Sequence, residues 1–248
     1  MIYICIPAHD EARTLGVLLW KIRKVMREFG RDYRILVHDD GSRDGTAELL
    51  GRYARVVPLD IERSSSARGY GATLHALLER AAEVSPYPKR DVVVTLQADF
   101  TESPDAIVPM VKAIEGGADL VCGTVTEDRG RTRGERFTRW AAGRLLGSSL
   151  RDAPVPDPFC GLRAFRVIVL KKALRSGQFT PLAPLSGPAV NLEVLRSLSP
   201  FARRLVESPV VERGDLRQRP SRLRVLSALR SFGRIRGRVW TVGVEDAA

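Results

Sequence analysis

Polar side chains that could bind a ligand follow three apolar segments within the first hundred residues. They are Pro7-Ala8-His9-Asp10-Glu11, His38-Asp39-Asp40-Gly41-Ser42 and Gln97-Ala98-Asp99. Acidic groups gathered at one place repel one another unless a cation or a donor-rich ligand lies among them. Their carboxylates suit ribose hydroxyls, the N–H groups of a base and a divalent metal ion, which prefers oxygen ligands. They do not suit bare nucleic acid, so we expect no nucleic-acid partner.

The second half of the chain carries the opposite charge. The 248 residues hold 40 basic and 29 acidic side chains, a formal net charge of +11. Much of the excess lies in two arginine runs, at positions 129, 131, 133, 136, 139 and 144 and at positions 217, 219, 222, 224, 230, 234, 236 and 238. Guanidinium groups match phosphate oxygens well, so the runs are candidates for ligand phosphates or an anionic membrane. A solvated basic surface and an arginine-rich coding bias are the alternatives.

Apolar runs rich in β-branched residues alternate with helical patterns over residues 1–125. We expect strands near 2–6, 33–38, 55–59, 91–96 and 118–122, and helices near 12–29, 44–54, 70–84 and 104–116. This alternation predicts βαβ units and therefore an α/β fold with a mostly parallel sheet. Ligands of such sheets bind beyond the carboxyl ends of the strands, where the three polar segments stand.

The pattern changes after residue 125. Residues 126–136 are charged and poorly periodic, which predicts a mobile loop, and an amphipathic helix is expected at 137–150. Residues 152–163 are rich in Pro and Asp. Helices near 166–176 and 187–198, an extended segment at 204–213 and a basic helix at 221–236 are expected to follow. Because no repeat or linker divides the chain, we expect a single domain.

The composition also restricts where the protein works. Cys5, Cys122 and Cys160 show no pair spacing, which argues against a disulfide framework or zinc site and favours a reducing compartment. No apolar run approaches the roughly 20 residues that span a bilayer, and the apolar N-terminus is expected to be a buried strand, not a signal peptide. The sequence thus predicts a cytoplasmic protein.

The C-terminal segment, residues 216–248, has two interpretations. Val225, Leu226, Leu229, Phe232 and Ile235 recur at helical spacing among arginines. Such a basic amphipathic helix suits the inner face of an anionic membrane, which predicts a peripheral membrane protein. Alternatively, the helix packs its apolar stripe on the domain.

Six motifs, in order, resemble those of the family 2 glycosyltransferases, and within them the dolichol-phosphate or polyprenyl-phosphate sugar synthase group. Ile6-Pro7-Ala8-His9-Asp10-Glu11 resembles the family's Pro-x-x-Asn-Glu, and residues 37–46, Val-His-Asp-Asp-Gly-Ser-Arg-Asp-Gly-Thr, resemble Asp-Asp-Gly-Ser-x-Asp-Gly-Thr. Gly69-Tyr70-Gly71-Ala72 resembles a Gly-rich helix start, and Gln97-Ala98-Asp99 occupies the place of Asp-x-Asp. Residues 157–166 resemble Asp-x-x-x-Gly-Phe-Arg, and Arg219-Pro220-Ser221-Arg222 resembles a terminal Arg/Gly/Ser-Lys element. The resemblance implies one GT-A domain, Rossmann-like, with a mostly parallel central sheet flanked by helices.

The resemblance also implies roles for individual residues. Residues 1–125 would form the nucleotide-sugar-binding half and residues 126–215 the acceptor-side half. The donor nucleotide would contact Pro7, Ala8, Glu11, Asp39, Asp40, Gly71, Gln97 and Ala98. The catalytic residues would be Asp99, Asp157 and Arg163, and the phosphate or acceptor residues would be Arg131, Arg133, Arg219 and Ser221.

A Mg²⁺ or Mn²⁺ cofactor is implied at the sugar diphosphate, with Asp99 as its ligand and Gln97 as a weaker one. Gln97 replaces the usual first Asp of the motif, and Thr101 stands where the group often has Gln. These differences leave fewer metal ligands than the family pattern has.

The expected reaction is inverting transfer of a sugar from a UDP- or GDP-sugar to a polyprenyl phosphate, of the dolichyl or undecaprenyl type. One alternative is transfer to a hydroxyl group with Asp157 as the general base. Another is a non-catalytic protein that binds nucleotide sugars.

Overall fold

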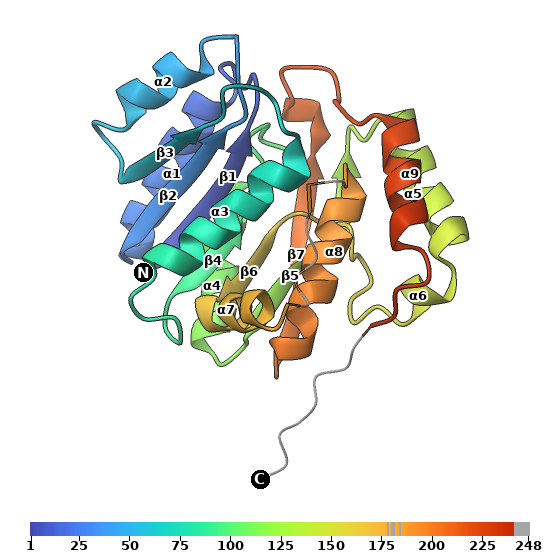
Figure 1. The fold of residues 1–248 in the computed structure, drawn as a ribbon. Helices are drawn as coiled ribbons and strands as arrows, with labels where there is room; N and C mark the ends of the chain where they lie inside the picture. The colour runs from blue at the N-terminus through green and yellow to red at the C-terminus, as the bar shows by residue number, and fades with distance from the viewer. Residues whose placement is uncertain (178, 180–181, 184, 241–248) are drawn as a thin grey trace.

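The computed structural model describes residues 1–177, 179, 182–183 and 185–240 of the chain. Its centre is a seven-stranded sheet in the order β3-β2-β1-β4-β6-β5-β7 (Figure 1). The strands are β1 (Ile2–Ala8), β2 (Tyr33–Asp39), β3 (Leu59–Arg63), β4 (Val92–Thr95), β5 (Leu120–Arg129), β6 (Arg163–Arg166) and β7 (Leu205–Arg213). Only β6 pairs antiparallel with its neighbours, β4 and β5, whereas the other pairs are parallel. The predicted mostly parallel sheet is therefore confirmed.

Helices cover both faces of the sheet. They are α1 (Leu15–Phe29), α2 (Thr46–Tyr53), α3 (Tyr70–Val84), α4 (Ile107–Glu115), α5 (Arg133–Leu146), α6 (Ser148–Arg151), α7 (Val167–Arg175), α8 (Pro188–Leu198) and α9 (Val225–Ile235). In the described residues, 3₁₀ turns lie between strands and helices at Pro104–Ala106, Ser199–Phe201 and Gly214–Leu216. Figure 1 shows α3, α7 and α8 on the face of the sheet toward the viewer.

Side-chain alternation along the strands explains the two apolar cores. In β1, Ile2, Ile4 and Ile6 pack with the buried faces of α1 and α4, whereas Tyr3 and Cys5 pack with α3, α7 and α8. Successive strand residues point to opposite faces, so a strand covered on both sides must be apolar throughout. The continuous apolar runs in the sequence follow from this constraint.

Two segments differ from expectation. A strand at 55–59 was predicted, but the strand is Leu59–Arg63, because the Val57 amide bonds to the Tyr53 carbonyl and continues the turn that ends α2. The mobile loop predicted at 126–136 is wrong, because β5 runs to Arg129 along β7 and α5 begins at Arg133. The charges of this stretch lie on an exposed part of the β5–β7 pair, where strand polarity resembles that of a loop.

Two local features account for the remaining differences. A capping box starts α5, because Thr132 accepts the Glu135 amide while the Glu135 side chain accepts the Thr132 amide. The predicted helix at 137–150 is thus two shorter helices, α5 and α6. Strand β6 was not predicted, because it is four residues long and has an arginine at each end.

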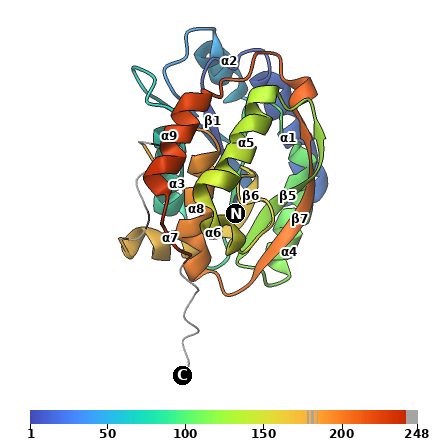
Figure 2. The ribbon, with the colours of Figure 1, turned by 90° about the vertical axis from the view of Figure 1, so that its right-hand side faces the viewer.

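The C-terminal helix packs on the domain. Helix α9 lies beside α5 and α8 (Figure 2), and Phe232 and Ile235 are fully buried in the core that includes α8. The alternative of a stripe packed on the domain is therefore the observed one, although Leu226 remains 71% exposed. The end of this segment, 241–248, lies outside the described residues. Within the described part of the chain, every helix is too short or too polar to cross a bilayer.

Candidate functional site

A cavity of about 400 Å³ opens beyond the carboxyl ends of β1, β2 and β4. The strand-end residues on its wall are Pro7, Ala8, Glu11, Asp40, Gln97, Ala98 and Asp99. Opposite them stands a stretch between β7 and α9, residues 216–224, which we call the arginine segment. It contributes Arg217, Arg219, Ser221, Arg222, Leu223 and Arg224 to the wall. The structure thus brings most of the predicted donor residues together with the predicted Arg219 and Ser221.

The adjacent acids Asp39 and Asp40 have separate positions. Asp40 lines the cavity, and its two carboxylate oxygens accept the backbone N–H groups of Arg68 and Gly69, each at 2.8 Å. Asp39 lies behind it, fully buried, where it accepts the Ser42 amide at 2.9 Å and pairs with Arg63 at 3.2 Å. Asp40 therefore holds the turn that leads into α3, and Asp39 holds the loop after β2.

Glycines allow this loop and α3 to approach their neighbours. Gly41 has a φ of +68°, and a Cβ there would lie 2.8 Å from the Ser66 carbonyl carbon. A Cβ on Gly71 would lie 2.1 Å from the Leu182 carbonyl oxygen. Gly71 does not line the cavity, so its position is explained by the close approach of α3 to the Leu182 and Leu185 carbonyls and not by contact with a ligand.

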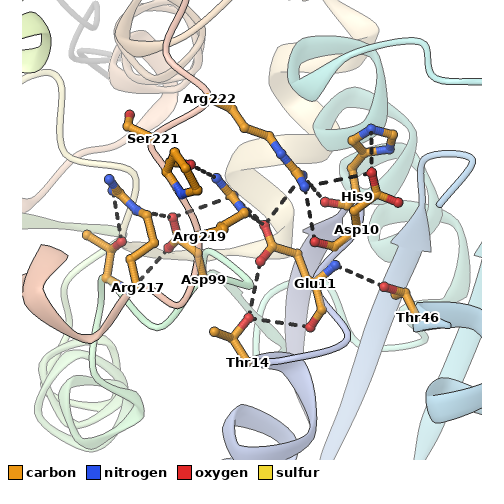
Figure 3. A network of polar contacts seen from close by, with 12 residues as sticks. His9, Asp10, Glu11, Thr14, Thr46, Asp99, Arg217, Arg219, Ser221 and Arg222 are labelled. Carbon is orange, nitrogen blue, oxygen red and sulfur yellow. Dashed lines mark hydrogen bonds and ion pairs between the residues drawn. The ribbon is translucent and has the colours of Figure 1, made fainter. Parts of the chain in front are cut away.

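Glu11 is a buried acid at the start of the first helical region. Its carboxylate accepts the Thr14 hydroxyl at 3.1 Å and the Arg219 Nε at 2.8 Å (Figure 3). The Glu11 amide in turn donates to the Thr46 hydroxyl at 2.9 Å. Burial raises the pKa of Glu11 above its ordinary value, although the Arg219 guanidinium pulls it down. Arg219 is therefore the charge partner of an acid that is only 4% exposed.

Asp99 is held by Arg217 of the arginine segment. Arg217 donates from Nε to Asp99 at 2.9 Å (Figure 3). It also donates from Nη1 to Glu135 at 3.0 Å and from Nη2 to the Thr101 hydroxyl at 3.2 Å. Ser221 also donates to Glu135, at 2.7 Å. Burial alone would lower the pKa of Arg217, but the two carboxylates outweigh it and raise that pKa. The guanidinium is therefore charged at any physiological pH.

A third arginine closes the same edge. Arg222 donates to the backbone carbonyls of His9 and Asp10, the latter at 3.0 Å, and its guanidinium lies 3.7 Å from the Glu11 carboxylate. Figure 3 shows Arg217, Arg219 and Arg222 side by side, each directed at the strand-end residues. The arginine segment thus neutralises Glu11 and Asp99, the acids that follow β1 and β4. Glu11 lies about two hundred residues before Arg219 in the chain.

Gln97 pairs with the buried Glu102 at the end of β4. Glu102 accepts the Gln97 amide at 3.1 Å and the Gln97 side-chain Nε2 at 3.4 Å. Burial raises the pKa of Glu102 to about 8, and Asp99 and Glu212 add to this shift. At neutral pH Glu102 therefore carries a proton for most of the time and adds little negative charge to the cavity.

The remaining predicted residues lie outside the cavity wall. Asp157 accepts Arg139 Nη1 at 2.7 Å and the Phe159 amide at 3.2 Å, so its carboxylate is engaged in an ion pair at the edge of the cavity. Arg163 is 1% exposed and donates to the backbone carbonyls of Asn191 and Pro158, both at 2.7 Å. This burial does not support the expected phosphate contact of Arg163.

Neither of the two arginines predicted on the loop reaches the cavity. Arg131 pairs with Glu212 and Asp128, and Arg133 is exposed at the first turn of α5. Their neighbour Arg139 does line the wall. Three residues of the site, Arg217, Glu102 and Glu135, were not predicted, because no motif marks them and only the fold brings them to the strand ends.

Comparisons with known proteins agree with this architecture. Residues 3–174 match the family model described as "Glycosyl transferase family 2". The chain is similar to undecaprenyl-phosphate 4-deoxy-4-formamido-L-arabinose transferases of Pseudomonas fluorescens (31% identity, covering 89% of this chain and 61% of the relative) and Edwardsiella ictaluri (30% identity, 84% and 58%). It therefore spans about three fifths of the length of these curated relatives.

Two solved structures share the fold. One is glucosyl-3-phosphoglycerate synthase from Mycobacterium tuberculosis in complex with Mn²⁺, UDP and glucosyl-3-phosphoglycerate, with a TM-score of 0.60 at 21% identity, covering 94% of this chain and 76% of that one. The other is S. aureus TarS 1-349 in complex with UDP-GlcNAc, with a TM-score of 0.59 at 13% identity, covering 92% and 61%. These likenesses confirm the expected GT-A fold.

Proposed function

Because the chain belongs to glycosyl transferase family 2, we propose that it transfers a sugar from a nucleoside diphosphate sugar to a polyprenyl phosphate. The names of the similar transferases, which act on undecaprenyl phosphate, support this acceptor class. Solved structures of the same fold hold UDP or a UDP-sugar, which supports a UDP-sugar donor. A GDP-sugar is the other donor to test.

The observation that carries the proposal is the contrast between the two walls of the cavity. The wall at the ends of β1, β2 and β4 offers carboxylates and backbone groups that suit a base and a ribose, and the arginine segment offers guanidinium groups that suit phosphates. A nucleoside diphosphate sugar offers a base and a ribose to the first wall and its phosphates to the second. Asp39 and Gly71, which the cavity does not touch, would then support the donor site from behind.

The reaction we propose is a single displacement with inversion. An acceptor phosphate oxygen forms a bond to the anomeric carbon as the bond from that carbon to the diphosphate breaks, and the nucleoside diphosphate leaves with the electron pair. Guanidinium groups placed where charge develops on the leaving group lower the barrier. A phosphate acceptor is already ionised at neutral pH, so this route needs no general base.

Transfer to a hydroxyl group is the second candidate, with Asp157 as the base. The ion pair of Asp157 with Arg139 does not favour it, because a carboxylate stabilised by a guanidinium is a weaker base. Asp157→Asn separates the two routes. Near-normal turnover is expected for a phosphate acceptor, and loss of about 10²-fold or more is expected if Asp157 takes a proton.

The decisive assay supplies the purified chain with UDP- and GDP-sugars and with either undecaprenyl phosphate or undecaprenol in detergent. We expect a lipid-linked sugar with undecaprenyl phosphate only, whose anomeric configuration is opposite to that of the donor. Equal transfer to undecaprenol would contradict the phosphate acceptor. Donor binding without any transfer or donor hydrolysis would instead support the non-catalytic alternative.

We also propose that the enzyme works at an anionic membrane surface, where its acceptor resides. The outer face of α5 exposes Phe137 (48%) and Trp140 (60%), whose rings lie 5.6 Å apart, and Arg144 stacks on Trp140. Exposed aromatic rings beside arginines suit the boundary between headgroups and acyl chains. Leu226 of α9, which contacts α5, is exposed as well.

Trp140→Ala tests the membrane proposal. We expect about ten-fold weaker binding to phosphatidylglycerol vesicles in a sedimentation assay, with an unchanged free energy of unfolding. Tyr87→Ala, which removes an equally exposed ring from another part of the surface, should leave vesicle binding unchanged. Equal binding by all three proteins would contradict this surface.

A further inference from the structure

The residues that the family pattern assigns to a metal ion are bonded to an arginine in this chain. Arg217 contacts Asp99, which stands at the second Asp of the Asp-x-Asp motif, at 2.9 Å. It also contacts Thr101, two residues after that Asp, at 3.2 Å. The first position is Gln97, whose amide faces Glu102. The Arg217 side chain is only 10% exposed, so its guanidinium is enclosed beside Asp99 and Thr101.

The residues present do not fit a divalent metal. Mg²⁺ and Mn²⁺ need several hard oxygen ligands, and carboxylates supply most of the protein's share. Within the part of the chain that the structure describes, no three Asp, Glu, His or Cys side chains lie together as a candidate metal site. Glu102, the acid nearest to Asp99 in sequence, already uses its two carboxylate oxygens to accept the amide and the side-chain Nε2 of Gln97. Asp99 is left as a single carboxylate, and it already has a charged partner.

We propose that Arg217 takes the place of the divalent cation, so that this chain binds its sugar-diphosphate donor and stabilises the leaving group without a metal. The inference rests on the proposed function for the identity of the ligand, a nucleoside diphosphate. It departs from the cofactor expected from the family, and it adds a leaving-group residue that no motif marked.

The geometry of the guanidinium suits this role. Arginine has five N–H donors, and Arg217 uses one on each of its three nitrogens to hold Asp99, Glu135 and Thr101. One N–H on each terminal nitrogen remains for an oxygen of the ligand. A divalent metal held by Asp99 would supply the same kind of charge to the leaving diphosphate.

Arg219 and Arg222 supply the rest of the positive charge. A guanidinium carries one positive charge where a divalent metal carries two, so a single arginine neutralises less of a diphosphate. Both neighbouring arginines line the cavity and are more exposed than Arg217, with side-chain exposures of 21% and 39% against 10%. They can therefore turn toward a ligand while Arg217 stays in place.

The first test measures donor binding. Thermal shift and calorimetry with UDP, GDP, UDP-glucose and GDP-mannose are run on metal-free protein in EDTA and again with Mn²⁺. We expect the preferred nucleotide to bind within about two-fold of the same affinity in both conditions, because no metal is required. Arg217→Ala should weaken binding about 10–100-fold, the usual effect of losing a charge-assisted hydrogen bond.

Matched variants separate this role from a structural one. Arg213→Ala, four residues earlier, removes a surface pair with Asp215 and should bind nucleotide normally. Arg217→Lys keeps the charge without the fork and should restore part of the lost affinity. If Arg217→Ala fails to fold, the EDTA comparison on the unaltered chain still decides the question, and a strict Mn²⁺ requirement there overturns the proposal.

The second test does not depend on any sugar transfer. Mn²⁺ is titrated into the protein, with and without UDP, and its bound fraction is followed by electron paramagnetic resonance against a UDP blank. We expect no protein-bound Mn²⁺ in the unaltered chain, and a new site in Gln97→Asp/Arg217→Ala, which supplies the second carboxylate and removes the guanidinium. Binding of Mn²⁺ to the unaltered chain that is lost in Asp99→Asn would overturn the proposal. If no nucleotide binds in any condition, the donor proposal fails while this titration still decides the metal question.

Discussion

The strand-end acids and the arginine segment face each other across one cavity, but the chain positions them in different ways. Asp39 and Asp40 accept backbone N–H groups from residues 42, 68 and 69, within the same half of the chain. Arg217 and Arg219 instead reach their sites from beyond β7 and are held by the acids they contact. The acids thus belong to the scaffold of the sheet, whereas the arginines are placed by charge.

This difference has a consequence for stability and ligand binding. Loss of a scaffold acid removes the carboxylate that accepts these backbone N–H groups, and the whole turn is affected. Loss of an arginine from the segment removes charge from the cavity, and its cost to the fold depends on how deeply its partner is buried. The following variants test how far the two regions behave as different kinds of structure.

Asp40→Ala should have the largest effect. It leaves the Arg68 and Gly69 amides unpaired, each of which costs about 1–3 kcal/mol, so we expect a loss of about 2–5 kcal/mol in the free energy of unfolding by urea. Nucleotide binding should disappear with the turn. Asp60→Ala removes an exposed pair with Arg34 and should change stability by less than about 0.5 kcal/mol. Similar losses for both variants would contradict a scaffold role for Asp40.

Glu102 represents a third arrangement, an acid without an arginine. Its pKa is raised to about 8 from 4.5, so the folded state binds a proton that the unfolded chain has released above pH 4.5. The unfolding free energy should therefore fall as the pH rises from about 5 to 8, since proton binding favours the folded state less and less. Glu102→Gln should flatten this part of the pH profile in urea unfolding. A profile that keeps its slope in Glu102→Gln would assign the titration to another group.

Arg219→Ala should have an intermediate effect. It leaves Glu11, which is 4% exposed, without its strongest partner, and the pKa of Glu11 should rise further as a result. We expect a loss of about 1–3 kcal/mol in unfolding free energy at pH 8 and a smaller loss at pH 5, where Glu11 can take a proton. Glu11→Gln in the same background should recover part of this loss. No recovery would show that Arg219 does not act through Glu11.

Arg222→Ala should have the smallest effect on stability. Its side chain is 39% exposed and its partners include backbone carbonyls that water can also reach, so we expect a change below about 1 kcal/mol. Nucleotide affinity should fall nonetheless, and the fall should be smaller at high salt. A loss of stability as large as that of Arg219→Ala would remove the distinction between the buried and the exposed arginines.

The sequence predicted the sheet well where strands are covered on both faces. The apolar runs at β1, β2, β4 and the start of β5 have no other common explanation, and their ends identified the strand-end wall of the cavity. It predicted poorly where a strand is short or charged. β6 carries an arginine at each end, and the far part of β5 resembles a loop, because pairing with a distant strand stabilises both.

The candidate site divides in the same manner. The residue types at the ends of β1 and β4 indicated which acids would lie close together, since the ends of neighbouring parallel strands share one edge of the sheet. For Asp39 and Asp40 the motif named both, but the alternation of side chains along β2 leaves only Asp40 on the cavity wall. Arg163 carried a family motif, yet its guanidinium is buried against backbone carbonyls.

By itself, the sequence determined the fold class, the acidic edge and the presence of Gln97 at the place of the first Asp of the family's Asp-x-Asp, because each depends on local residue types and spacing. Only the tertiary structure decided which arginines face that edge. Thirty-four arginines are chemically alike in sequence, and nothing local sets Arg217 apart from Arg213 or Arg224. The paths of β7 and α9 across the domain bring Arg217 to Asp99, 118 positions earlier in the chain, and such long-range pairing follows from packing and not from the residues themselves.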